Sequence, residues 1–291
     1  MRRTCLALAT AALVITPTSA AEPVAIAPNG PWNLDYADEK CMLTRLFGEG
    51  ENMHFLAFQQ YWPAREAGVT VAGPSFDRFR SLAKTDVRFF DGQEPMQTTP
   101  FTGSVGTYGT GVIFSTLRPD KGVPEANKLG ETGQPGLPQM DVSLGQQMRF
   151  FELQQGGRTV RLETGAMDEA FAALNQCTIS LLGEWGLDAE RHLTAQSKPR
   201  WLNEAALVRK IVASYPRDAL AQGEQAILRM RVIVSPEGAV ESCTLIKATN
   251  TIRLESPVCD VMKRAEFEPA RDANGQPFRS LFATSITYRI G

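Results

Sequence analysis

The chain has 291 residues, 43% of them hydrophobic, and a formal net charge of −2 at pH 7. This length suits two ordinary domains, and the hydrophobic content is that of a globular protein. The acidic balance supplies no dense basic face of the kind that nucleic acids require, so the composition argues against a nucleic-acid partner.

Residues 1–21 have the pattern of a secretory signal peptide. Arg2 and Arg3 give a basic start, an apolar run covers residues 5–15, and small residues follow, so we expect cleavage after Ala20 or Ala21. A membrane anchor would need about 20 apolar residues, roughly twice this run. No later stretch is long and apolar enough, so we expect an exported protein with no stable membrane span after cleavage.

Four cysteines remain after this cleavage, and an even number in an exported chain indicates disulfides. Of the three pairings that four cysteines allow, we expect the two that stay within one domain, Cys41–Cys177 and Cys243–Cys259. The second bridge closes a loop of about 16 residues, worth about 3 kcal/mol in the chain-entropy model. Zinc sites need closer spacings such as C-x2-C, which the chain lacks, so we expect no metal and no cofactor.

Residues 22–190 are predicted to form a β-rich domain of unknown function. Apolar alternation indicates strands within residues 31–65, 68–76, 86–92 and 109–117, and a hairpin within residues 148–162. From Met167 to Trp185 the apolar residues recur every three or four positions, which predicts a C-terminal helix for this domain. The polar stretch 191–198 is predicted to be a linker.

Residues 199–291 are predicted to form a second, smaller domain with the element order helix, strand, strand, helix, strand. An apolar stripe at helical spacing starts after Asn203, which can cap the first helix. A hairpin follows, in which Arg229 and Arg231 lie on the face opposite to the apolar side chains. The whole chain is therefore expected to be an α+β protein.

The second helix of this domain is predicted to start at Ser256 and to end at Pro269, with Phe267 as its last apolar anchor. Asn274-Gly275 is predicted to reverse the chain. The final run then alternates as a strand to the end of the sequence.

These turns, caps and anchors resemble the C-terminal domain of the TonB energy-transducer family. The resemblance covers about 75 residues; no single piece of it is specific, but the pieces occur in the family's order. It implies a small α/β sandwich, with one sheet packed on two helices. The positions that carry the resemblance are Tyr215, Pro216, Gly223, Gly238, Phe267, Pro269, Asn274 and Gly275.

The resemblance also implies binding of an extended peptide from an outer-membrane receptor by strand addition to an edge strand. The edge would be the last strand, residues 281–290. The alternative is that the first domain or a second copy of the chain covers this edge, which leaves a homodimer open. The partner contacts implied are Leu281, Phe282, Thr284, Ile286, Tyr288 and Ile290.

The N-terminal domain resembles uncharacterised periplasmic proteins of alphaproteobacteria, a resemblance that implies no activity. Together the two resemblances imply the periplasm of a Gram-negative bacterium. The residues that carry the N-terminal resemblance are Trp32, Leu34, Tyr36, Cys41, Phe47, Gly48, Cys177, Trp185 and Gly186.

Patterns for catalysis are weak. His54 and His192 lie far apart and have no partner motif, and Ser104 lacks the first glycine of the G-x-S-x-G nucleophile elbow. We therefore predict a non-enzymatic periplasmic binding or adaptor protein whose TonB-like domain recognises a protein or peptide. One alternative is a TonB-type energy-transducing component of outer-membrane transport, although classical transducers have an anchored helix and a Pro-rich spacer where this chain has a β-rich domain. The other is a hydrolase in the N-terminal domain.

Overall fold

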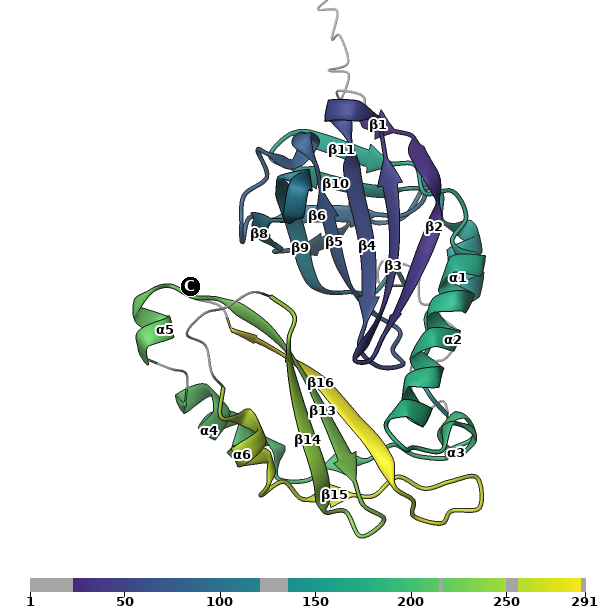
Figure 1. The fold of residues 1–291 in the computed structure, drawn as a ribbon, viewed down its shortest axis with the longest axis vertical. Coiled ribbons are helices and arrows are strands. Elements are labelled where there is room, and N and C mark those ends of the chain that lie inside the picture. Colours follow the sequence, from purple (N-terminus) through teal and green to yellow (C-terminus); the bar gives the residue numbers. More distant parts are fainter. Residues whose placement is uncertain (1–22, 121–135, 215–216, 250–255, 289–291) are drawn as a thin grey trace, which may run out of the picture.

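The computed structural model of the chain describes residues 23–120, 136–214, 217–249 and 256–288 (Figure 1). It is an α+β protein with a β-rich N-terminal part and a smaller C-terminal part built on a three-stranded sheet. The predicted fold class is confirmed. The predicted signal peptide lies outside the described residues, and the predicted domain boundaries stay a prediction.

Two sheets form the N-terminal part. One has six strands in the order β2-β3-β4-β5-β9-β8, with bounds Pro28–Ala37, Lys40–Phe47, His54–Gln60, Ala67–Ala72, Thr110–Leu117 and Phe101–Ser104. The other has five strands in the order β1-β11-β10-β6-β7, with bounds Val24–Ile26, Arg158–Leu162, Phe151–Gln155, Thr85–Arg88 and Met96–Thr98. Short 3-10 helices cover Gly50–Asn52, Pro74–Phe76 and Gly106–Tyr108.

One aromatic core joins these two sheets to helix α2 (Asp168–Glu184). Phe58 of β4 meets Phe151 of β10 edge to face, with the ring centroids 6.3 Å apart, and meets Phe171 of α2 at 5.8 Å. All three side chains are buried, because the alternating apolar residues of each strand point to the same interior.

Helix α2 runs beside β2 and β3, and the Cys41–Cys177 disulfide bonds it to β3 with the two Cα atoms 6.1 Å apart (Figure 1). The predicted helix and its bridge are confirmed. Helix α1 (Val142–Gln147) precedes α2, and helix α3 (Ala189–Leu193) follows it. Helix α3 includes the first residues of the stretch that was predicted to be linker.

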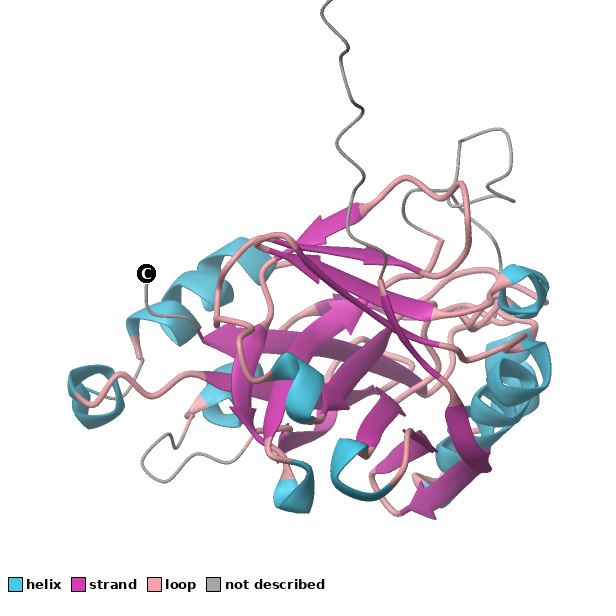
Figure 2. Cartoon of the chain, turned by 90° about the horizontal axis from the view of Figure 1, so that it is seen from above, coloured by secondary structure: helices cyan, strands magenta, loops and turns pink. Residues whose placement is uncertain are grey.

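The C-terminal part packs the strand order β14-β13-β16 against helices on one face (Figures 1 and 2). Met230, Val232 and Phe282 belong to the core between this sheet and the helices. The predicted Cys243–Cys259 disulfide joins β14 to α6, with the Cα atoms 5.5 Å apart. The bounds are Glu204–Ala213 for α4, Arg217–Ala221 for α5, Ala226–Val234 for β13, Val240–Lys247 for β14, Val258–Met262 for α6 and Ser280–Tyr288 for β16.

The prediction that the second helix of this part continues to Pro269 is wrong. Helix α6 ends at Met262, and Phe267 lies in the short strand β15 (Phe267–Glu268), which pairs with β12 (Arg200–Trp201). Phe267 stacks on Trp201 with the ring centroids 6.2 Å apart. Backbone pairing and aromatic burial together stabilise the extended conformation here more than another helical turn would.

The predicted turn at Asn274-Gly275 is confirmed, because the Gly275 N–H donates to the carbonyl of Asp272 and Gly275 has a φ of +75°. Gly223 and Gly238 also have left-handed backbones, with φ values of +67° and +86°. These three glycines therefore occupy positions that L side chains rarely adopt. The two other motif residues, Tyr215 and Pro216, lie outside the described residues.

Candidate functional site

The sheet of the C-terminal part has a polar face that lies against the N-terminal part. Strand β13 alternates, so Arg229 and Arg231 project from the face opposite to the helices, as the sequence predicts. Both arginines are nevertheless buried, 5% and 8% exposed. A face that would ordinarily be solvated is therefore an interface between the two parts of the chain.

Arg229 holds this interface near its centre. Its guanidinium donates to the carbonyl of Ser115 on β9 at 2.6 Å and to the hydroxyl of Ser285 on β16, and it lies 5.2 Å from the ring centroid of Tyr61. Burial lowers the pKa of Arg229, and the neighbouring Tyr61 and Glu66 oppose that shift. Three separate elements are thus connected through one cation.

Arg231 makes the second connection. Its guanidinium pairs with Glu39 of the β2–β3 turn at 2.5 Å and lies 3.9 Å from the ring centroid of Trp185, just after α2. A polar groove of about 650 Å³ surrounds this pair. The two arginines, which alternate along β13, therefore connect this strand to different elements of the N-terminal part: Arg229 to β9, and Arg231 to the β2–β3 turn and the end of α2.

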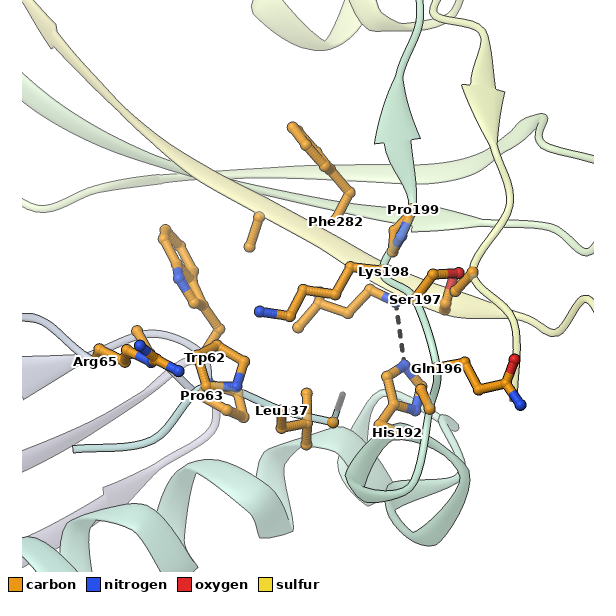
Figure 3. A pocket seen from close by; sticks show the side chains of 18 of the residues that line it. Trp62, Pro63, Arg65, Leu137, His192, Gln196, Ser197, Lys198, Pro199 and Phe282 are labelled. Carbon is orange, nitrogen blue, oxygen red and sulfur yellow. Dashed lines mark hydrogen bonds between the residues drawn. The ribbon is translucent and has the colours of Figure 1, made fainter. Parts of the chain in front are cut away.

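Strand β16 has an outer edge, because within the described sheet it pairs with β13 on one side only. The backbone N–H of Leu281 donates across this edge to Nε2 of His192 at 3.2 Å (Figure 3). The other ring nitrogen, Nδ1, lies 2.6 Å from the carbonyl of Asp188, so Nδ1 carries the proton and Nε2 accepts. His192 thus caps the start of this edge.

A groove of about 800 Å³ lies beside this part of β16. The loop between β4 and β5 forms one wall with Trp62, and β16 forms the other with Phe282 (Figure 3). His192 and the segment that contains Lys198 form the remaining boundary, together with Leu137. Both parts of the chain therefore contribute to one groove.

The groove contains both apolar and cationic groups. The Lys198 side chain extends across it toward Trp62 (Figure 3), and Lys198 makes no hydrogen bond or ion pair with any residue that the structure describes. Desolvation and the charge of Arg65 lower the pKa of Lys198, whereas Glu66 raises it. Arg118 also lines the groove but is paired with Asp120. The cation best placed to meet an anionic ligand is therefore Lys198.

The residues predicted to contact a partner occupy two different environments. Leu281 and Phe282 line the groove. Ile286 packs toward the helices, and Tyr288 is buried with its hydroxyl 3.2 Å from that of Ser256. Thr284 shares their strand face and Ile290 lies outside the described residues. What the groove offers is mainly the backbone edge of β16.

Of the residues that line the groove, only Leu281 and Phe282 were predicted as site residues; those that the sequence analysis missed include Trp62, Arg65, Lys198 and, as a binding residue, His192. The one sequence feature that could have indicated a binding site is the Trp62-Pro63 pair, because an aromatic residue in a short loop between two strands is costly to expose. The pairing of that loop with the edge of β16 depends on how the two parts pack. Sequence periodicity does not carry that information.

His54, the residue on which the hydrolase alternative depends, is fully buried and held by backbone groups. Its Nδ1 lies 2.8 Å from the carbonyl of Asn52, and its Nε2 accepts from the N–H of Ser75 at 3.2 Å. Both ring nitrogens are thus engaged, and His54 lines neither of the two large grooves described above. Ser104 lies at the end of β8 and is not among the hydrogen-bond partners of His54 in the described residues.

The described residues also bear on two other classes of function, metal binding and membrane spanning. They contain no group of three or more His, Cys, Asp or Glu side chains arranged to hold a metal ion. Among the same residues, every helix is too short or too polar to cross a membrane.

Residues 212–290 match the model of the Gram-negative bacterial TonB protein C-terminal family. The predicted family resemblance of the C-terminal part is thereby confirmed, and that family is not an enzyme family. No curated protein and no solved structure matches the chain. The TonB-type domain and the two disulfides are consistent with a protein of the cell envelope or periplasm.

Proposed function

We propose that this protein is a non-enzymatic binding or adaptor protein of the Gram-negative periplasm, and that it recognises an extended protein or peptide segment by strand addition to β16. The observation that carries the proposal is the groove of about 800 Å³ beside the unpaired edge of β16. An edge strand presents a row of backbone donors and acceptors, and a peptide laid along it satisfies them while its alternate side chains give selectivity.

The register of β16 indicates which backbone groups face the groove. The N–H of Leu281 points away from β13, toward His192, and in an antiparallel pair the outward-pointing residues alternate. The N–H and carbonyl of Ala283 should therefore face outward as well, and Ala283 lines the groove. No described residue forms a hydrogen bond with these outward groups of Ala283.

The experiment uses the full chain and a labelled peptide from the periplasm-facing segment of an outer-membrane receptor. Proline at position 283 removes the outward donor but leaves the ladder with β13 intact, since proline is tolerated on the free side of an edge strand. We expect the Ala283→Pro variant to keep its thermal midpoint and lose at least fivefold in affinity, a change of about 1 kcal/mol. Ala283→Gly, which keeps the N–H, is the matched control.

A second measurement tests the same idea from the side of the peptide. One peptide is N-methylated at its odd-numbered amides and another at its even-numbered amides. One of the two should lose binding and the other should keep it, because only alternate amides face β16. Equal binding by all methylated peptides, together with unchanged affinity of Ala283→Pro, would exclude strand addition.

The family match favours one second candidate, a TonB-type component of energy-dependent outer-membrane transport. That role requires mechanical connection to the inner membrane. Fractionation of cells that express the full chain distinguishes the two candidates: an uncleaved protein in the inner membrane supports the transducer, and a cleaved protein in the periplasmic fraction supports the adaptor.

A further inference from the structure

The groove beside β16 has a second wall that the C-terminal part does not provide. Trp62 and Arg65 lie on the loop after β4, and they face the edge of β16 across the groove (Figure 3). Any segment that pairs with the backbone around Ala283 must therefore also contact the N-terminal part. Residues outside the TonB-like domain thus border the space beside β16.

The position of this loop is fixed by hydrogen bonds. The side-chain amide of Gln60, which is buried at the end of β4, donates to the carbonyls of Ala64 and Glu66, both at 2.8 Å. The neighbouring Tyr61 packs against Arg229 of β13. The loop is thus tied at its base to the first sheet and to the interface, so Trp62 is held in place before a ligand arrives.

The charges of the groove favour a carboxylate. Lys198 extends into the groove with no ion-pair or hydrogen-bond partner among the described residues, and the positive charge of Arg65 is near enough to influence it. Glu66 supplies the opposing negative charge, and Asp120 neutralises Arg118. Because the charge of Arg65 repels that of Lys198, an anionic group that pairs with Lys198 relieves this repulsion.

The remaining lining is apolar and suits a side chain next to that carboxylate. Trp62, Leu137, Pro199 and Phe282 surround the space that Lys198 enters (Figure 3). An extended peptide presents successive side chains to opposite sides, so an acidic and an apolar residue can contact different walls. Aromatic anchors in partly enclosed grooves commonly dominate binding.

We propose that the groove between β16 and the Trp62 loop selects an extended peptide segment that carries an acidic side chain beside an apolar one. Lys198 pairs with the carboxylate and Trp62 packs on the apolar side chain. The proposal rests on the proposed function, because the peptide backbone is held by β16. It adds that the N-terminal part determines which peptide is accepted.

The test measures binding of the full chain to an array of nine-residue peptides of alternating Val and Thr, in which the central residue is Glu, Asp, Gln or Lys. We expect the Glu and Asp peptides to bind about five- to tenfold more tightly than the Gln peptide, and the Lys peptide to bind least, as for a partly buried ion pair. The Lys198→Gln variant should bind the Glu and Gln peptides equally. Lys210→Gln, on the exposed side of α4, is the matched control and should leave the preference unchanged.

The Trp62→Ala variant should bind every peptide of the array at least tenfold more weakly, because the apolar contact does not depend on the central charge. The thermal midpoints of all variants are measured in parallel to exclude loss of fold.

Equal binding of all four peptides, or no binding of any, would overturn the charge selectivity. Binding that keeps its acidic preference in Lys198→Gln would place the site elsewhere. The chain can prefer acidic peptides, and lose that preference in Lys198→Gln, while Ala283→Pro binds as tightly as the unmodified chain. That result would exclude strand addition and support the groove contacts, so the experiment distinguishes the two proposals.

Discussion

Replacing Arg229 by alanine should weaken the attachment of the C-terminal sheet to the N-terminal part. The guanidinium donates to the Ser115 carbonyl at 2.6 Å and to the Ser285 hydroxyl, and it packs on the ring of Tyr61. Hydrogen bonds from a charged donor contribute about 1.5–3 kcal/mol each, and a cation–π contact about 1 kcal/mol. The gross gain is therefore about 4–7 kcal/mol.

The net effect is smaller, because no carboxylate of the described residues is in direct contact with this buried guanidinium, and burying it costs several kcal/mol. The lowered pKa of Arg229, caused mainly by desolvation, reflects this cost. We expect Arg229→Ala to lower the free energy of unfolding by about 2 kcal/mol after this offset. Arg209→Ala, on the exposed surface of α4, is the control and should change it by less than about 0.5 kcal/mol.

Denaturant unfolding measures the loss, and hydrogen exchange locates it. Faster exchange should appear in β9 and β16, on the two sides of the interface, and not in the core around Phe58. A variant at Gly68 provides an independent check, because a Cβ added there would lie 2.9 Å from the Arg229 guanidinium. Gly68→Ala should be destabilising alone and nearly neutral in the Arg229→Ala background.

Two results would refute this reasoning. An unchanged or raised stability of Arg229→Ala would mean that desolvation of the cation cancels its contacts. Additive effects of Gly68→Ala and Arg229→Ala would mean that the two positions are not in contact in solution.

Three further predictions concern stability. Burial lowers the pKa values of His54 and His192, so the unfolded chain binds protons first as the pH falls. The contribution of these two histidines to stability is therefore complete above pH ~6.5, and below that pH each site loses up to about 1.4 kcal/mol of stability per pH unit. A His54→Gln/His192→Gln variant should flatten this pH dependence in denaturation curves between pH 7.5 and 5.5. Alanines in place of both cysteines of the β3–α2 bridge should lower the unfolding free energy by about 3–5 kcal/mol, measured without reductant; an unchanged midpoint would contradict a formed bridge. Gly238→Ala should lower the thermal midpoint far more than Gly157→Ala. Both glycines have positive φ, but only at Gly238 would a Cβ meet a carbonyl oxygen, at 2.0 Å. Equal losses of the thermal midpoint in the two variants would count against this close approach.

Local patterns in the sequence identified most of the elements. The three- and four-residue spacing after Met167 predicted α2, the alternation in β13 separated its two faces, and Asn274-Gly275 marked a real turn. These features depend on residues close together in the chain, whose geometry the backbone fixes. The error at Phe267 has the opposite origin, because its strand conformation depends on pairing with Trp201, far away in the sequence.

The groove could not be predicted for the same reason. Trp62, Lys198 and Phe282 come from segments that are well separated in the chain, and no local sequence pattern indicates that the three meet. Because His192 has no partner motif in the sequence, nothing beyond an ordinary hydrogen bond is expected of it. The hydrogen bond is real, but its partner, the N–H of Leu281, makes it part of the edge of β16.

The burial of Arg229 and Arg231 has a consequence for how peptide binding should be studied. A fragment that begins at residue 199 would expose both arginines, and it would lack the Trp62 wall, Lys198 and the His192 cap. Its β16 edge would be free from Leu281 onward, so longer and less acidic peptides should bind to the fragment than to the full chain. If the fragment and the full chain instead prefer the same peptides, the N-terminal part does not contribute to selection and the interface serves only stability.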